Sequence, residues 1–290
     1  MTRWLVLIAI LGVMVPVSAQ KLEPGTTTAL YKKTSTKDFI RIKAAGVKWV
    51  EVALNQCYRG TPMEQIVPRI EAMKAMIDSA GLKVWSIHLP FSRTLDISAA
   101  DDSLRRENVS FMAKMIRKSG LFAPQRLVLH PSSEPIAEEE RETRIANTIA
   151  SIRLLKSEAE AIGAELCIEN LPRTCLGNTP EELVRIVDAV PGVGICFDTN
   201  HYVGGSTEHF MDVTGKRIRT LHCSDFDFEN ECHWLPTQGD IDWKVFVRRL
   251  HDIGYDGVFM YEAIKDRPSQ KRLSPEQIAE SYNEIFRDEP

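Results

Sequence analysis

Two short runs of sequence decide the fold class: residues 166–169 read Leu-Cys-Ile-Glu, and residues 194–198 read Gly-Ile-Cys-Phe-Asp. Each run is apolar and β-prone and ends with an acidic residue. Between them, Thr179-Pro180-Glu181-Glu182 predicts the start of a helix, with threonine as the cap and proline at the first helical position. A strand, a helix and a second strand in this order are typical of a parallel sheet connected by helices.

The same pattern recurs along the chain. Eight β-prone runs are expected to be strands, and they cover Ala29–Lys33, Trp49–Leu54, Val84–Leu89, Arg126–His130, Leu166–Glu169, Gly194–Asp198, Ile218–Cys223 and Val258–Glu262. Segments with apolar residues at helical spacing lie between them, among them Glu64–Ala80, Arg144–Ile162 and Trp243–Ile253. Five helical segments end at glycines that we expect to be left-handed, namely Gly46, Gly81, Gly120, Gly163 and Gly254.

Eight strand–helix units without a long linker predict an α/β protein with a single (β/α)₈ TIM barrel over residues 20–290. The alternative is an open doubly wound sheet, which would normally carry a glycine-rich phosphate loop after an early strand. The sequence has no such loop, so the barrel is the better prediction.

Residues 1–19 differ from the rest of the chain. Arg3 is followed by an almost wholly apolar run to Val17, and Val17-Ser18-Ala19 is a small-residue cleavage pattern. This predicts a secretory signal peptide, with a mature protein that begins near Gln20 in the periplasm or outside the cell. A membrane anchor is the alternative, but the run is short for a span, and no later segment is apolar enough for stable membrane insertion.

Charge and cysteine content limit the partners. The formal net charge is −4, and loss of residues 1–19 with Arg3 makes it −5, which argues against a nucleic-acid partner. Three of the six cysteines, Cys167, Cys196 and Cys223, fall inside β-prone runs and are expected in the core. Cys175 and Cys232 fall in predicted loops, where they either form a disulfide after export or stay free.

Seven of the eight predicted strands end with an acidic residue or a histidine. These residues are Glu51, His88, His130, Glu169, Asp198, His222 and Glu262. In a TIM barrel the carboxyl ends of the strands carry the chemistry. Any one of them alone is readily explained as a hydrogen-bonded core or rim residue. Converging as a set, however, the carboxylates would repel one another, and a divalent cation bound by oxygen and nitrogen ligands resolves this.

Four of these strand ends carry a resemblance to a known family. Ile168-Glu169-Asn170, Phe197-Asp198-Thr199-Asn200-His201, Leu221-His222 and Tyr261-Glu262-Ala263 resemble motifs of the xylose isomerase-like TIM-barrel superfamily. Gly239-Asp240-Ile241-Asp242-Trp243 is similar to the loop that leads into its penultimate helix. That superfamily holds sugar isomerases and epimerases, keto-sugar lyases and AP endonucleases.

The resemblance implies roles for individual residues. Glu169, Asp198, His222 and Glu262 would hold one divalent metal, usually manganese, with zinc, cobalt or magnesium as substitutes. Glu169 and Glu262 would also be the catalytic proton-transfer groups. Substrate-binding residues are expected among the other polar and aromatic positions near the strand ends, which are Glu51, His88, His130, His201, His233 and Trp234.

Three enzymatic functions compete. A sugar isomerase or epimerase would remove a proton α to a carbonyl and return it. A lyase on 3-keto-glycosides would begin with the same step and then eliminate a leaving group, with a sugar dehydrogenase as its functional partner. An AP endonuclease would need three metals, for which His88, His130, His201, Glu231 and His233 could supply ligands, with Glu231 where an aspartate is usual.

Two features of the sequence limit the possible substrates of a sugar isomerase or epimerase. Ketose 3-epimerases carry a substrate-binding glutamate six residues after the first ligand and an arginine six residues after the histidine ligand, but Cys175 and Phe228 stand here. The ends of strands seven and eight lack a basic or glycine-rich phosphate site, and an exported enzyme would not meet sugar phosphates. We therefore expect a small, non-phosphorylated carbohydrate substrate. A non-catalytic sugar-binding barrel is the remaining alternative.

Overall fold

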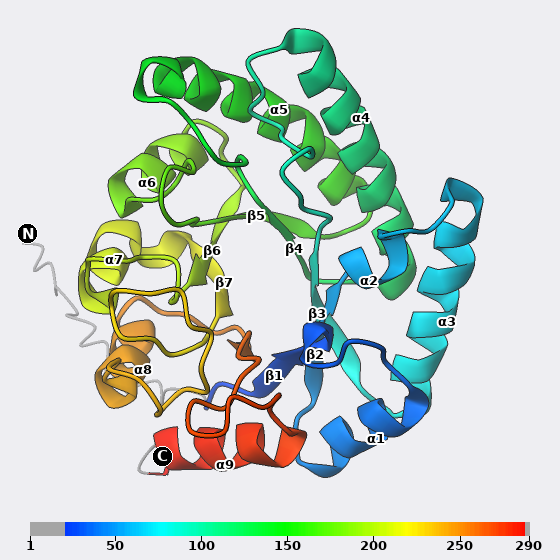
Figure 1. Cartoon of the computed structure of the whole chain (residues 1–290), viewed down its shortest axis with the longest axis vertical. Helices are drawn as coiled ribbons and strands as arrows, with labels where there is room; N and C mark the ends of the chain where they lie inside the picture. Colours follow the sequence, from blue (N-terminus) through cyan, green and yellow to red (C-terminus); the bar gives the residue numbers. More distant parts are fainter. Residues whose placement is uncertain (1–20, 288–290) are drawn as a thin grey trace, which may run out of the picture.

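The computed structural model describes residues 21–287, which fold into a parallel barrel inside a ring of helices (Figure 1). Its strands are β1 Pro24–Thr27, β2 Trp49–Ala53, β3 Lys83–His88, β4 Arg126–Leu129, β5 Glu165–Glu169, β6 Gly194–Asp198, β7 Ile218–His222 and β8 Phe259–Tyr261. They lie in the order β7-β6-β5-β4-β3-β2-β1-β8. A parallel bridge between Cys223 and Tyr261 joins the two ends, so the predicted (β/α)₈ barrel is confirmed.

Each strand is followed by a helix that packs on the outside of the barrel. The helices are α1 Thr36–Ala44, α2 Asn55–Tyr58, α3 Ile66–Ser79, α4 Asp102–Ser119, α5 Arg141–Ala161, α6 Pro180–Asp188, α7 Thr207–Thr214, α8 Trp243–Asp252 and α9 Pro275–Ile285. The predicted cap Thr179 accepts a hydrogen bond from the Glu182 amide at the start of α6, and Ser274 forms a capping box with Gln277 at the start of α9.

The prediction for the first strand was wrong. The strand is Pro24–Thr27, and Ala29 lies in the short 3₁₀ turn Thr28–Leu30 that follows it. Pro24-Gly25 reads as a turn, yet proline is tolerated at the first position of a strand. Gly25 is needed because a Cβ there would lie 2.6 Å from the Val258 side chain inside the barrel.

One of the five glycine predictions was also wrong. Gly46, Gly81, Gly163 and Gly254 have positive φ angles, as expected of left-handed residues that end helices. Gly120 instead stays helical and begins a 3₁₀ turn, and Ala123 takes the left-handed conformation with φ of 48°. The chain therefore reverses three residues later than the glycine suggests.

The barrel interior is a stack of packed layers beneath the carboxyl ends of the strands. Trp85, Val258 and Met260 form a lower cluster, and the Trp85 indole donates to the Thr220 hydroxyl at 3.0 Å. Val128, Cys167 and Cys196 form a separate apolar cluster. Because side chains alternate along a strand, Glu169 and Asp198 project into the interior two residues beyond Cys167 and Cys196.

Two sequence expectations concern the compartment. The predicted signal peptide, residues 1–19, lies outside the described residues. Across residues 21–287, none of the helices is both long enough and apolar enough to span a bilayer. All six cysteines are free, so the Cys175–Cys232 disulfide is not formed.

Candidate active site

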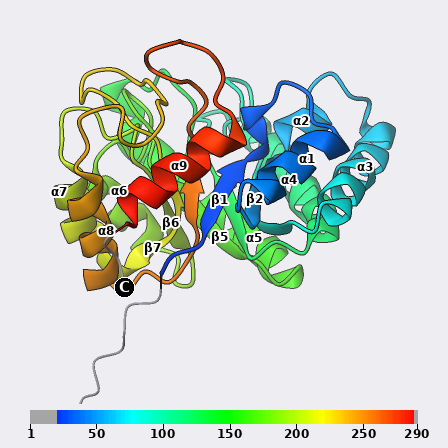
Figure 2. The same ribbon diagram turned by 90° about the horizontal axis from the view of Figure 1, so that it is seen from below.

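A cavity of about 620 Å³ opens at the carboxyl ends of the strands. Figure 2 shows this end of the barrel at the top, where the long connections that follow β7 and β8 rise above the helices. The cavity is lined by His88, His130, Glu169, His201, His233 and Glu262 on its polar side. Volumes of this order are typical of small-molecule sites.

The floor of the cavity holds the four residues expected to bind metal. One ligand atom from each of Glu169, Asp198, His222 and Glu262 lies within 4.8 Å of the other three. The Nδ1 atom of His222 is 3.2 Å from Glu169 Oε1 and 3.1 Å from Glu262 Oε2. They come from β5, β6, β7 and the residue after β8, so the strand ends bring them together, as the sequence predicts.

The floor fits a divalent cation. Three carboxylates meet around one imidazole, and the oxygens Glu169 Oε2 and Asp198 Oδ2 are buried without a well-aligned hydrogen bond. Burial raises the pKa of Asp198 to about 7, against the attraction of His201. Burial also opposes ionisation of Glu169, but the neighbouring His222 and His130 outweigh it and hold the pKa well below its usual range. Clustered, desolvated acids of this kind are stabilised by bound metal.

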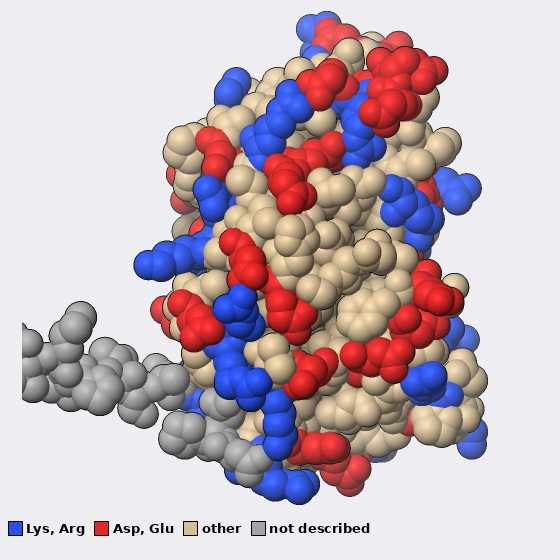
Figure 3. All heavy atoms as spheres, turned by 90° about the vertical axis from the view of Figure 1, so that its left-hand side faces the viewer, with Lys and Arg blue, Asp and Glu red and all other residues tan. Residues whose placement is uncertain are grey.

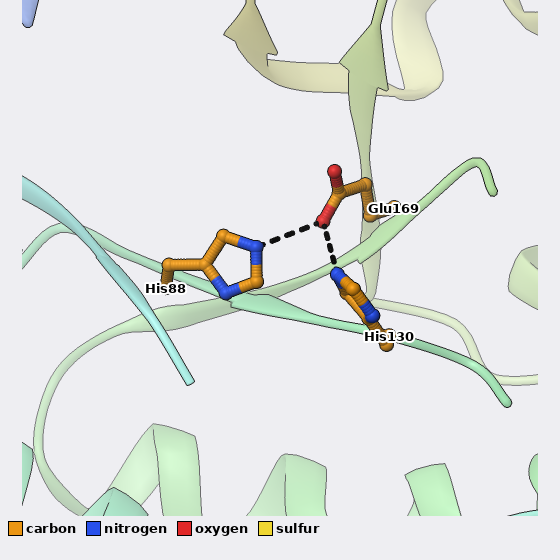
Figure 4. Close-up of side chains that lie close together, drawn as sticks. All are labelled: His88, His130 and Glu169. Atoms are coloured by element: carbon orange, nitrogen blue, oxygen red, sulfur yellow. Dashed lines mark ion pairs between the residues drawn. The ribbon is translucent and has the colours of Figure 1, made fainter. Parts of the chain in front are cut away.

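Two histidines, His88 and His130, contact one oxygen of Glu169 (Figure 4), whereas His222 contacts the other. His88 Nε2 and His130 Nε2 lie 3.2 Å and 3.1 Å from Glu169 Oε2. Burial lowers the pKa of His88, but Glu169 overcomes it and raises the pKa to about 9. Burial prevails at His130, whose pKa is lowered. Glu169 therefore favours the protonated form of His88, whereas burial favours the neutral form of His130.

A second group of polar side chains lies above the floor. His201 Nε2 and His233 Nε2 lie 3.5 Å and 3.7 Å from Glu231 Oε1, and these three residues form another set of potential metal ligands. Arg173 pairs with both Glu231 and Glu134, which links the loops after β4, β5 and β7. These contacts hold the pKa of Glu231 well below its usual range, first through hydrogen bonds from His201 and His233.

Two residues expected to bind substrate do not line the cavity. Glu51 is fully buried beneath it, where it contacts His222 and Ser86. Trp234 pairs its backbone with Asp225, and the Arg267 guanidinium lies over its ring, 4.2 Å from the centroid. Of the two departures from the ketose 3-epimerase pattern, Cys175 lines the cavity, whereas Phe228 packs against Phe226.

Sequence reasoning missed most of the opposite wall. Ala29, Asn55, Gln56, Arg59, Phe91 and Arg93 line the cavity there. The Phe91 ring stacks on His130 with centroids 4.6 Å apart, and its carbonyl accepts from Asn55 and Arg59. These residues lie on connections after the strands, where no strand register indicates which side chains face inward. Arg173 was missed for the same reason.

The conformation of the loop after β7 is stabilised by hydrogen bonds to one buried residue, Asp225. Asp225 accepts hydrogen bonds from the backbone amides of Thr237 and Ile241 and from the Trp243 indole. A Cβ at Gly239 would lie 2.4 Å from the Asp225 carboxylate, so the glycine of the Gly-Asp-Ile-Asp-Trp motif is required there. Asp242 of the same motif caps α8. The motif therefore helps to fix the connection between β7 and α8, which also carries the cavity-lining residues Glu231 and His233.

The profile of one protein family, described as a xylose isomerase-like TIM barrel, matches residues 39–287. The chain belongs to this family. Fructoselysine 3-epimerase of Escherichia coli O157:H7 is 21% identical over 258 residues, which cover 84% of this chain and 83% of that protein. A probable endonuclease 4 of Methanoculleus marisnigri is 22% identical over 231 residues, which cover 72% and 78%.

The solved structure of a sugar epimerase shows the same architecture. The 3-keto-D-glucoside 4-epimerase of E. coli has a TM-score of 0.71 at 18% identity, and the match covers 92% of this chain and 100% of that one. Identity at this level shows the shared fold. The relatives thus include sugar epimerases and a probable nuclease, and the chemistry of the site is needed to distinguish these functions.

Proposed function

We propose that this protein is a divalent-metal-dependent sugar isomerase or epimerase that removes a proton α to the carbonyl of a non-phosphorylated carbohydrate. The observation that supports it most is the floor of the cavity. Glu169, Asp198, His222 and Glu262 offer ligand atoms within 4.8 Å of one another, and both glutamates also line the cavity. The sugar epimerases among its relatives agree with this proposal.

The four floor residues would hold one divalent ion, with manganese as the first expectation and zinc, cobalt or magnesium as alternatives. Such an ion supplies Lewis-acid polarisation of a carbonyl oxygen, which acidifies the neighbouring C–H. Glu169 and Glu262 are then placed to remove and return the proton. Glu262 has a side chain 16% exposed, against 1% for Glu169, so Glu262 has the freer approach to substrate.

The imidazoles around the floor suit a polar, uncharged substrate. His88 and His130 approach Glu169 from the cavity wall, and His201 and His233 lie above it. Imidazole N–H groups can donate hydrogen bonds to the oxygens of sugar hydroxyls. The arginine that contacts the upper group, Arg173, is already paired with Glu134 and Glu231, so it is not free to bind a phosphate.

A β-eliminating lyase on 3-keto-glycosides is the second candidate. It begins with the same proton removal and needs room for a second sugar or another leaving group. The cavity of about 620 Å³ extends from the floor to a neutral and basic wall that includes Phe91, Arg59 and Arg93, which favours a substrate larger than one sugar. In this case a sugar dehydrogenase would supply the ketone.

A role on nucleic acid is the weaker proposal, although the ligand groups of the upper site suit additional metals. The chain has a formal net charge of −4. Acidic and basic side chains are interleaved on the face shown in Figure 3. Binding of a phosphate backbone favours a continuous basic face. A non-catalytic sugar-binding barrel would not need paired glutamates at a cation site.

We further propose that the protein is exported and acts in the periplasm or outside the cell. The support is the apolar run after Arg3 and the small-residue pattern at Val17-Ser18-Ala19. Protein isolated from its host should begin near Gln20. Recovery of Met1 or Thr2 at the amino terminus of the mature protein would contradict this proposal.

The activity is tested by loading metal-stripped protein with each cation and incubating it with free ketoses, aldoses and 3-keto-glycosides. We expect turnover that requires the cation. Formation of an isomer or epimer supports the main proposal, whereas release of an aglycone or a second sugar supports the lyase. Cation-independent turnover, or cleavage of DNA containing abasic sites in the absence of sugar turnover, would contradict both.

A further inference from the structure

Glu51 is an acidic residue that neither the cavity nor the fold explains. It lies in β2 with 0% of its surface exposed. Its Oε2 atom accepts a hydrogen bond from the Ser86 hydroxyl at 2.8 Å and lies 2.9 Å from His222 Nε2. Its Oε1 atom is buried without a hydrogen-bond partner. Burial of a carboxylate with one unpaired oxygen costs free energy and does not stabilise a core. The role of Glu51 is therefore to be found in the residues that it contacts.

His222 has different surroundings at its two nitrogens. Its Nδ1 atom faces the floor carboxylates, at 3.2 Å from Glu169, 3.1 Å from Glu262 and 3.9 Å from Asp198. Its Nε2 atom faces Glu51. A histidine that binds a metal is a neutral imidazole, which carries one N–H and one lone pair. With the N–H on Nε2 donating to Glu51, the lone pair of Nδ1 is directed at the point where the carboxylates converge.

The backbone also directs Glu51 to this position. The pairing of β2 with β3 shifts between Val50 and Glu51, so that Val50 lies beside Val84 and Glu51 lies beside Ser86. The residue skipped by the shift is Trp85, which packs in the lower cluster. β-Bulges of this kind redirect side chains near functional sites. The shift brings the Ser86 hydroxyl to Glu51, where it fixes the carboxylate.

We propose that Glu51 is a positioning residue that holds the ring of His222 and its Nε2–H tautomer, so that Nδ1 completes the cation site. In this role Glu51 does not touch the substrate. Positioning of His222 thus replaces the substrate-binding role that the sequence suggested for Glu51. The inference rests on the cation of the proposed function, not on the identity of the sugar. Carboxylates that accept from the second nitrogen of a ligand histidine typically strengthen metal binding.

Cation affinity tests this role without a substrate. The dissociation constant for Co²⁺ or Mn²⁺ is measured by chelator competition on metal-stripped wild type and on Glu51→Met, Glu51→Gln and Ser86→Ala. Glu51→Met should weaken binding about 10- to 100-fold. Glu51→Gln keeps an acceptor and should weaken it less, and Ser86→Ala should have the smallest effect. Circular dichroism checks that each variant is folded.

Asp96→Asn is the matched control for loss of a buried carboxylate. Asp96 is buried and paired with Arg144 and Ser98, away from the four floor residues. Its substitution should leave the dissociation constant unchanged. In Zn²⁺-loaded wild type, NMR of the histidine rings should also show a protected Nε2–H on His222, and this signal should be shifted or lost in Glu51→Met.

The outcomes separate this inference from the proposed function. Wild type that binds no divalent cation contradicts both. Wild type that binds, with folded Glu51→Met within twofold of it, contradicts only the positioning role. If Glu51→Met does not fold, the ring signal of wild type decides: a His222 Nε2–H that is absent or exchanges freely with solvent overturns the inference.

Discussion

The two halves of the barrel mouth are built for different tasks. The half over β5 to β8 carries three acids and a histidine within 4.8 Å of one another, with further histidines around them. The half over β1 to β3 presents Ala29, Asn55, Gln56, Phe91 and two arginines to the cavity, and its buried Glu51 lies beneath the floor. The β5–β8 half, called the charged half below, can bind a cation and move protons, whereas the β1–β3 half presents no acid to the cavity and can only shape and recognise a substrate. Substitutions on the two sides should therefore affect different kinetic constants.

The largest effect is expected from the acids of the charged half. Glu262→Gln should keep the fold and lower kcat about 10³-fold, because the variant cannot accept the proton in the reaction. Glu134→Gln, an acid at the rim of the same cavity, is the matched control and should change kcat by less than fivefold, about 1 kcal/mol. Activity assays under saturating cation measure both. Equal losses in the two variants would show that the charged half is not specialised as described.

A smaller effect is expected from the upper group of His201, Glu231 and His233. We expect one tightly held ion per chain, at the floor, with the upper group contacting substrate. His233→Gln should then lower kcat/KM about tenfold, the loss of one hydrogen bond to substrate, with the metal content unchanged. Elemental analysis after dialysis measures the content. Two or three ions per chain, reduced by one in His233→Gln, would make the upper group a metal site instead.

The Glu169 carboxylate of the charged half should also make the metal-free protein sensitive to pH, through its contact with His88 at the end of β3. The pKa of His88 is raised to about 9, because its bond to Glu169 overcomes burial. The protonated form therefore stabilises the fold fully below the ordinary pKa of about 6.5, and this contribution is lost as pH rises through about 9. The Tm of metal-stripped protein should fall by several degrees between pH 7 and 10. His88→Gln should show a smaller fall over the same range, and an identical fall would remove His88 as the cause.

The smallest effect is expected from the half of the barrel mouth over β1 to β3. Phe91→Leu keeps an apolar side chain but removes the ring that stacks on His130. Its KM should rise about three- to tenfold with kcat within twofold, because the aromatic contact contributes about 1 kcal/mol to substrate and wall packing alike. A kcat loss comparable to that of Glu262→Gln would mean that both halves take part in the chemistry.

The barrel and its floor could be predicted from sequence because strand register controls both. An apolar run that ends in an acid or histidine places that residue at the mouth of the barrel, and Glu169, Asp198, His222 and Glu262 do converge there. The first strand was misplaced because Pro24-Gly25 resembles a turn. Trp234 was expected at the cavity, but the path of its loop depends on Asp225 and on packing with Arg267, which no local pattern reveals.

Glu51 shows a different limit of sequence reasoning. It also follows an apolar run, yet its strand continues to Ala53 and its carboxylate lies under the floor. A register shift between β2 and β3 and a partner on β7 determine its contacts. These are long-range features, so the sequence identifies the residue type but not its role.

Proton removal is tested most directly by solvent exchange at the carbon next to the substrate carbonyl. Metal-loaded protein is incubated in heavy water with the best sugar or 3-keto-glycoside from the activity screen. We expect deuterium at that carbon in wild type, and at least 10²-fold slower incorporation in Glu262→Gln or after metal removal. Turnover without any deuterium incorporation would contradict proton removal by the glutamates and would indicate a hydride shift instead.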